Sequence, residues 1–212
     1  MDKGELMYVE EREVFAQFRE GLRNHNLVLE EFVAACRAVN TRYDTAIYEN
    51  RFIVGGVVEQ LVGAAMRASG ARIENVAKTR RGIDLILPNS GIGFSVKSQF
   101  KRGPEIRLVN TMGSSGAKAR WDHATIFVIV GLGIGYADPE IASEGLVARS
   151  DALVLRIASL RELWVHHPEY LIECEIPSKP VAIGTSRVAS DVVAQDVLIE
   201  FKTLLGNYQP ER

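Results

Sequence analysis

The chain has 212 residues, of which 47% are hydrophobic and 25% are charged, and its formal net charge is −2. This composition is that of a folded globular protein and argues against extensive disorder. The two cysteines lack the spacing of a zinc site or a disulfide framework, and no apolar run reaches the ~18 residues that cross a bilayer. The acidic N-terminus does not look like a secretory signal, so we expect a cytoplasmic protein.

The first 70 residues have the pattern of helices. Apolar residues recur at helical spacing over 14–22 and again over 29–36, on either side of a polar break at 24–26. A third helix is predicted over residues 50–69, because Gly70 is a natural helix terminator.

Strand and turn patterns follow position 70. Residues 124–130 are strongly apolar, which is typical of a central strand buried on both faces. An apolar run at 152–157 precedes a predicted helix at 159–165, and the last helix is predicted over 190–205. Strands are predicted at 72–77, 83–87, 92–99, 106–109, 124–130 and 170–176.

This order of elements predicts one α/β (α+β) domain in which helices flank a central mixed β-sheet. No Pro/Gly/Ser-rich linker divides the chain. Glycines at 131, 133 and 135 follow the strongly apolar strand, but Tyr136 stands where a dinucleotide-binding loop needs its third glycine. We therefore interpret these glycines as a flexible turn.

Charge is distributed unevenly along the chain. Residues 78–120 contain nine basic and two acidic residues, a net charge of +7, whereas the rest contains 16 basic and 25 acidic residues. Such a basic segment is typical of a phosphate-binding face, because Lys and Arg supply the sequence-independent part of nucleic-acid affinity. The alternative is a chance cluster of basic residues on solvated loops.

Residues 82–100 read as two alternating strands around turn residues at 88–91, which predicts a β-hairpin. If the apolar residues of both strands share the core face, Asp84 lies opposite or diagonal to Ser95 and Lys97 on the other face. A carboxylate and an ammonium group would then lie within a few ångströms of each other. A simple cross-strand salt bridge is the alternative interpretation.

A second acid is suggested by Glu59 in the predicted helix 50–69. By angle it lies beside Phe52, Gly55 and Gly56, on the apolar, small-residue side of that helix. A carboxylate there is costly unless it is paired or binds a cation. The alternative is that Glu59 lies at the edge of this side and reaches water.

Glu59 in a helix, Asp84 on a strand and Lys97 on the next strand together resemble the PD-(D/E)xK nuclease superfamily, which includes most type II restriction endonucleases. The resemblance covers residues 50–100 and implies a restriction-endonuclease-like fold. It also implies that Asp84, a second acid and the backbone carbonyl of Val96 hold Mg²⁺, and that Lys97 orients or activates the attacking water. Hard oxygen ligands suit Mg²⁺, which stabilises charge on a scissile phosphate.

The chain departs from the superfamily pattern at Ser95, which stands where the second acid of the strand motif is expected. Some restriction-enzyme branches take that acid from further along, but residues 109–111 contain none. Glu59, or less favourably Glu105, must then complete the site. Residues 106–113, Trp121 and residues 124–139 further resemble the ScaI-type group of restriction enzymes.

The resulting prediction is a Mg²⁺-dependent type II restriction endonuclease that acts on double-stranded DNA as a homodimer. In this interpretation residues 1–49 form a helical N-terminal part, 50–139 the catalytic core and 140–212 the rest of a single domain. The alternatives are a repair or junction nuclease of the same fold and a non-catalytic DNA-binding domain. His123 is expected to be structural, with a phosphate contact as the alternative. Residues expected to contact DNA are Lys101, Arg102, Arg107, Lys118 and Arg120.

Overall fold

The computed structural model describes residues 7–43, 48–76, 82–88, 90–110, 120–178 and 189–210. The three predicted N-terminal helices are present, and a single residue, His25, separates the first two. Residue Gly70, just beyond the third helix, has φ +91°, as expected of a glycine terminator. These helices are α1 (Val9–Asn24), α2 (Asn26–Arg42) and α3 (Tyr48–Ala68).

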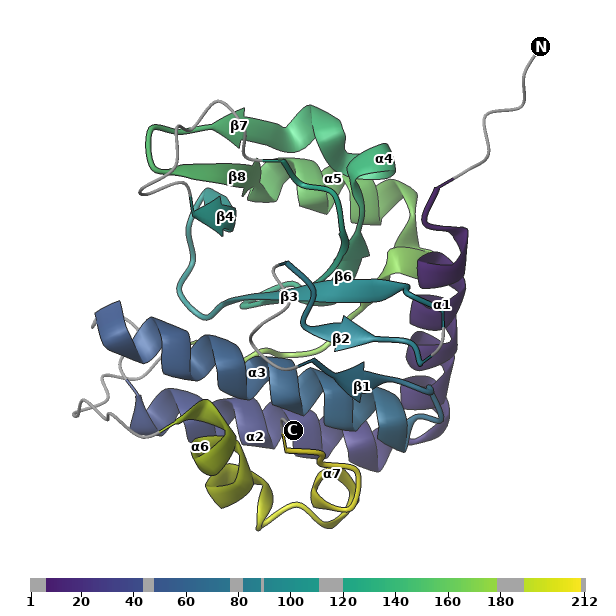
Figure 1. The fold of residues 1–212 in the computed structure, drawn as a ribbon, viewed down its shortest axis with the longest axis vertical. Helices are drawn as coiled ribbons and strands as arrows, with labels where there is room; N and C mark the ends of the chain where they lie inside the picture. The colour runs from purple at the N-terminus through teal and green to yellow at the C-terminus, as the bar shows by residue number, and fades with distance from the viewer. Residues whose placement is uncertain are drawn as a thin grey trace.

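A mixed sheet occupies the middle layer of the molecule (Figure 1). In the described part of the chain it has six strands in the order β1-β2-β3-β5-β6-β9. The β3–β5 pair is parallel, and the other neighbouring pairs are antiparallel. The strands are β1 (Glu74–Asn75), β2 (Leu85–Ile86), β3 (Gly93–Gln99), β5 (Ala124–Ile129), β6 (Gly133–Ala137) and β9 (Leu171–Ile172).

A smaller antiparallel sheet lies above the first in the view of Figure 1, together with α5. Its order among the described residues is β4-β8-β7. The elements of this upper layer are β4 (Glu105–Asn110), β7 (Leu146–Ala148), β8 (Ala152–Arg156), α4 (Pro139–Ala142), α5 (Ile157–His166) and the 3₁₀ turns Ser143–Gly145 and Pro168–Tyr170.

The central sheet separates two hydrophobic cores because consecutive strand residues point to opposite faces. Phe94 and Val96 of β3 pack into the lower core with α2 and α3. Phe127 of β5, whose Cα is the partner of Lys97, packs into the upper core with Trp164 of α5. Lys97 and Ser95 therefore lie on the upper face of β3.

The predicted last helix over 190–205 is wrong as one continuous element. The structure has two helices, α6 (Ser190–Leu198) and α7 (Lys202–Leu205). The carboxylate of Glu31 on α2 accepts hydrogen bonds from the backbone nitrogens of Thr203 (3.1 Å) and Leu204 (3.0 Å). A tertiary contact thus starts the second helix, and local sequence does not reveal it.

The interpretation of Gly131 to Gly135 as a flexible turn is wrong in its second half. Val130, Gly131 and Leu132 connect the strands, and Gly133 begins β6. At Gly135 a side chain would collide with the Trp164 ring, at 2.1 Å. The glycines make room for this packing within a strand. The predicted strands at 72–77 and 170–176 are also shorter in the described residues, being only β1 and β9.

A buried ion pair joins α1 to the start of α4. Arg12 donates from Nε to Asp138 Oδ2 (2.9 Å) and from Nη2 to Asp138 Oδ1 (3.1 Å). The Tyr136 hydroxyl also donates to Asp138 Oδ2, at 2.8 Å. Burial, followed by the Asp138 charge, raises the pKa of Tyr136. Every oxygen of the buried Asp138 carboxylate is therefore hydrogen-bonded, and its role is structural.

None of the helices in the described ranges has the length and apolar character needed to cross a membrane.

Candidate active site

The predicted hairpin is present, with Leu85 of β2 paired to Phe94 of β3. Asp84 immediately precedes β2, and its backbone nitrogen donates to the Phe94 oxygen at 2.8 Å. Its backbone oxygen accepts from the Val76 nitrogen at 3.0 Å. Asp84 is thus fixed between two neighbouring segments of the sheet, at the point where β2 begins.

The Asp84 carboxylate lies beside three consecutive residues of β3. Its Oδ2 atom accepts a hydrogen bond from the Val96 backbone nitrogen at 2.7 Å and another from Ser95 Oγ at 3.2 Å. Lys97 Nζ lies 4.0 Å from the same oxygen. The side chains of Asp84 and Lys97 are 22% and 27% exposed, so this pair is partly shielded but reachable from solvent. The predicted approach of Asp84 to Lys97 is therefore present.

The Val96 carbonyl points toward the same edge of β3. In a strand, the N–H and the C=O of one residue are directed at the same neighbouring strand. Because the Val96 N–H is directed at Asp84, its carbonyl also faces this edge of β3, past the last residue pair that β2 and β3 form. A carboxylate and a backbone carbonyl are thus directed at a common region beside Lys97.

Close packing around Gly93 holds the start of the hairpin. A Cβ atom at Gly93 would lie 2.6 Å from Ile83 Cγ2 and 2.6 Å from the Leu85 backbone oxygen. Ile83 directly precedes Asp84, so the absence of a side chain at Gly93 allows the segment before β2 to lie close to β3.

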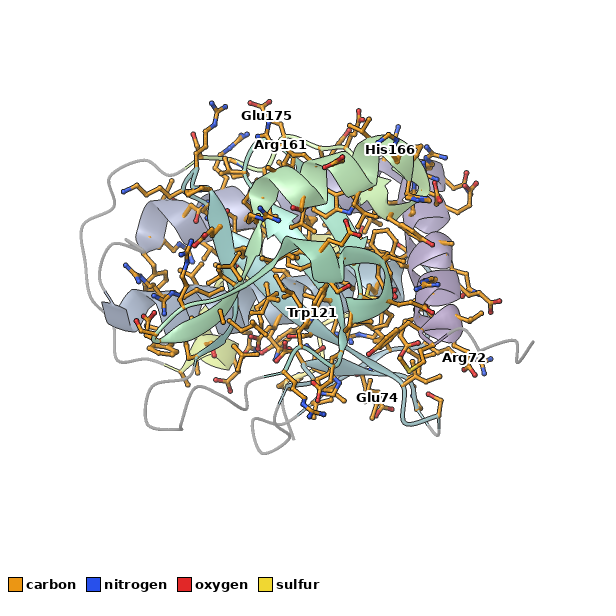
Figure 2. All side chains as sticks on the ribbon, turned by 90° about the horizontal axis from the view of Figure 1, so that it is seen from above. Arg72, Glu74, Trp121, Arg161, His166 and Glu175 are labelled. Carbon is orange, nitrogen blue, oxygen red and sulfur yellow. The ribbon has the colours of Figure 1, made fainter. Side chains whose placement is uncertain are left out.

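His123 contacts this segment as well. A Cβ atom at Gly82, where φ is +86°, would lie 2.9 Å from His123 Nε2. His123 Nε2 is 3.3 Å from Asp122 Oδ1, and the ring is about one-third exposed. His123 therefore lies against residue 82, two residues before Asp84, and its structural role stays a prediction. Trp121, labelled in Figure 2, is buried and donates from Nε1 to Thr125 Oγ1 at 2.9 Å.

Glu59 lies on α3, one turn before Gly63, and is half-buried. Its backbone oxygen accepts from Asn75 Nδ2 at 3.3 Å, and Asn75 is the β1 partner of Leu85. This turn of α3 is therefore close to the start of β2. It approaches from the lower side of the sheet, whereas Ser95 and Lys97 lie on the upper face.

The predicted faces of α3 are partly wrong. Phe52, placed on the apolar side, is 58% exposed, and a side chain at Gly55 would meet nothing within 4 Å. Gln60, placed on another side, is 1% exposed. The reason is that α3 packs against α2, α6 and the sheet at once, so its burial does not follow one apolar stripe. Glu59 lies one turn after Gly55, next to the part of α3 where an added side chain would meet no neighbour.

Glu105 begins β4, and its carboxylate forms an ion pair with Arg149. The hydrogen bond from Arg149 lowers the pKa of the Glu105 carboxyl. Its backbone oxygen accepts from Gln99 Nε2 at 3.0 Å, which ties the end of β3 to β4. Among the described residues no three His, Cys, Asp or Glu side chains gather into a metal-binding group, so Glu59, Asp84 and Glu105 do not form one cluster.

The residues expected to contact DNA lie after β3 and on the upper sheet. Lys101, Arg102 and Arg120 are exposed. Arg107 on β4 is exposed and forms an ion pair with Asp151, with Arg107 Nη2 and Asp151 Oδ2 2.6 Å apart. Lys118, with residues 111–119 as a whole, lies outside the described residues.

Sequence reasoning did not identify Arg149, which joins Glu105 and Arg107 in this group of charged side chains. It lies outside the basic segment 78–120, directly after β7, and only the tertiary structure brings it to Glu105. No local sequence signal predicts this position. The adjacent residues His166 and His167, at the end of α5, are exposed, and His166 is labelled in Figure 2.

The donor atoms at Asp84 fit a hard divalent cation. Within the described part of the chain, Asp84 Oδ1 makes no hydrogen bond, and the Val96 carbonyl faces the same edge. Mg²⁺ is commonly held by one or two carboxylates, with water and phosphate oxygens completing its coordination. The chain supplies one such carboxylate at this point, with Lys97 beside it.

A solved structure described as a restriction endonuclease in complex with substrate DNA is similar to this chain. The TM-score is 0.54 at 14% sequence identity, and the match covers 85% of this chain and 98% of that chain. No family model matches the sequence, and no curated protein matches it. The similarity shows the fold, which is restriction-endonuclease-like with a central mixed sheet flanked by helices. The predicted fold class is confirmed, whereas assignment to the ScaI-type group stays a prediction.

Proposed function

We propose that this chain is a Mg²⁺-dependent endonuclease that cleaves double-stranded DNA, of the type II restriction kind. The observation that carries the proposal is the constellation of Asp84, the Val96 backbone and Lys97 within a restriction-endonuclease-like fold. The similar solved structure holds substrate DNA, and we extend that substrate to this chain. The basic segment 78–120 supports an anionic polymer as ligand.

In the proposed site, Asp84, the Val96 carbonyl and a second acid would hold the cation. When bound, Mg²⁺ stabilises the negative charge that develops on the scissile phosphate. Lys97 Nζ donates to the attacking water and, by its positive charge, lowers the cost of removing a proton from it. We assign the second acid to Glu59 because its turn of α3 lies close to the start of β2, where Asp84 stands.

DNA is proposed to lie across the residues that follow β3 and along β4. Lys101 and Arg102 lie just past the end of β3, after Phe100, and the Gln99–Glu105 hydrogen bond fixes that connection to β4. Arg107 and Arg120 extend this basic surface, and Lys118, which lies outside the described residues, is proposed to contact DNA as well. Phosphate contacts from these side chains would set the register of the duplex, and contacts to base edges would give specificity.

We further propose that two copies of the chain act together. A two-fold symmetric dimer matches a palindromic recognition sequence and supplies one active site for each strand.

A plasmid digestion tests the proposal. The purified protein is incubated with supercoiled plasmid in Mg²⁺ or in EDTA, and the cut ends are mapped to the nucleotide. We expect discrete bands that appear only with Mg²⁺, and we expect the mapped ends of the fragments to lie within one palindromic sequence. Cleavage of branched junctions in preference to duplex would instead identify a structure-specific nuclease of the same fold. The absence of cleavage in any divalent cation would contradict the proposal.

One observation favours a second candidate, a non-catalytic DNA-binding domain. Ser95 stands in place of an acid, and the described residues do not gather a three-carboxylate group. Such a domain would bind duplex DNA with an affinity that falls with salt and would show no turnover.

A further inference from the structure

The two hydrogen bonds to Asp84 Oδ2 leave its two oxygens in different situations. A carboxylate oxygen offers two lone-pair directions. On Oδ2 one accepts from the Val96 nitrogen at 2.7 Å and the other from Ser95 Oγ at 3.2 Å. Oδ2 is therefore saturated by the protein itself, whereas Oδ1 makes no hydrogen bond within the described residues.

Ser95 is in a position to keep this arrangement fixed. It is 5% exposed and stands beside Asp84 on the upper face of β3. A buried hydroxyl that lost its acceptor would pay a desolvation cost, so the Ser95–Asp84 bond resists exchange for water. Lys97 Nζ, 4.0 Å from Oδ2, adds positive charge on the same side. Every described partner of the carboxylate thus approaches Oδ2.

We propose that Ser95 is a positioning residue which, together with the Val96 amide, restricts Asp84 to one divalent cation bound through Oδ1. This inference rests on the proposed function of the same site. A second cation that used the other carboxylate oxygen would need Oδ2, and binding there would break one of its two hydrogen bonds. An acidic residue at position 95 would instead provide oxygens for such a bridge. Ser95 therefore sets the number of cations as well as the orientation of the carboxylate.

The test counts bound ions directly. The full-length protein is titrated with Mn²⁺ alone, without DNA, and free Mn²⁺ is measured by its EPR signal. Wild type is expected to bind one Mn²⁺ per chain, and Asp84→Asn none at this site. Ser95→Ala should bind the ion about 10- to 100-fold more weakly, the usual effect of removing a hydrogen-bond partner of a metal ligand. Ser95→Thr keeps the hydroxyl and should restore the affinity to within about 3-fold of wild type.

Ser98→Ala is the matched control, because Ser98 lies on β3 with its side chain on the opposite face. It should bind Mn²⁺ as wild type does. Thermal unfolding of each variant establishes that it is folded, so a loss of ion binding is not a loss of structure. If Ser95→Ala is unfolded, Ser95→Thr and the wild-type stoichiometry still decide the question.

Two bound ions per wild-type chain would overturn the inference, as would equal affinity in wild type and Ser95→Ala or an ion that persists in Asp84→Asn. If the protein nevertheless cuts plasmid DNA in Mg²⁺, the proposed function stands and only the role of Ser95 is rejected. If wild type neither binds Mn²⁺ nor cuts DNA, the proposed function fails as well.

Discussion

Asp84 Oδ2 accepts a hydrogen bond from the backbone nitrogen of Val96 at 2.7 Å. The carboxylate thus takes the role that a backbone carbonyl of a neighbouring strand would otherwise play beside β3. The preceding link on this edge is an ordinary backbone hydrogen bond, from the Asp84 nitrogen to the Phe94 oxygen. One residue thus both ends the β2–β3 pairing and supplies its last acceptor. The site is therefore rigid because it is built into the sheet ladder, which is the kind of support that catalytic groups need.

The packing at Gly93 should be essential to this arrangement. Gly93→Ala places a methyl group 2.6 Å from the Leu85 backbone oxygen, which cannot move without the strand. We expect a loss of about 1–3 kcal/mol in the free energy of unfolding, measured by urea denaturation.

Gly55→Ala is the control for Gly93→Ala. It adds the same methyl group inside α3, where nothing lies within 4 Å, and should stabilise the protein by about 0.5–1 kcal/mol. Equal stability changes in the two variants would show that the close approach at Gly93 carries no cost.

The Arg12–Asp138 ion pair should carry much of the attachment of α1. Arg12→Ala leaves the fully buried Asp138 carboxylate without its guanidinium partner, and we expect a loss of about 3 kcal/mol in unfolding free energy. Glu140→Ala removes only the more exposed partner of Arg12 and should cost less than about 1 kcal/mol. The prediction fails if the two variants unfold at the same urea concentration.

Arg107 and Asp151 should affect DNA binding in opposite directions. Arg107→Ala should lower the salt dependence of duplex affinity by about one counterion, because a phosphate contact is lost. Asp151→Ala frees the Arg107 guanidinium from an exposed ion pair and should tighten binding by up to about 5-fold. Fluorescence anisotropy at several salt concentrations measures both effects. Arg161→Ala, an exposed arginine of α5, is the control and should change neither quantity.

The identity of the second acid can be tested by neutral substitutions. Glu59→Gln should reduce Mg²⁺-dependent cleavage by at least about 10-fold, because a charged ligand is lost. Glu105→Gln should leave cleavage within about 3-fold, since that carboxylate is paired with Arg149. The reverse pattern in plasmid cleavage rates would assign the role to Glu105.

The lowered pKa of Glu105 gives the Glu105–Arg149 ion pair a pH dependence. The hydrogen bond from Arg149 favours the charged carboxylate in the folded state, so the pair is intact above the ordinary pKa of glutamate. It is lost as the pH falls through the lower folded-state value. Arg149→Ala should return the Glu105 pKa to its usual range, as NMR titration of the side-chain carboxyl would show.

Local sequence patterns predicted the hairpin and the approach of Asp84 to Lys97 because strand alternation and turn chemistry act over a few residues. They did not predict the packing of α3, since a helix covered on several sides has no single apolar stripe, and Gln60 is buried while Phe52 is exposed. They also missed the break before α7, which Glu31 caps from α2, and the place of Arg149 beside Glu105. In each case the deciding contact joins residues far apart in the chain.

The most direct test of the central claim separates cleavage from binding at Lys97. Lys97→Ala should lower the rate of Mg²⁺-dependent plasmid cleavage by about 100- to 1,000-fold, the usual loss when one charge-stabilising group is removed. Affinity for the cleaved sequence, measured in Ca²⁺, should stay within about 3-fold of wild type, because Lys97 lies beside Asp84 rather than among the exposed residues Lys101, Arg102 and Arg107. Cleavage by Lys97→Ala at the wild-type rate would contradict the assignment of this site.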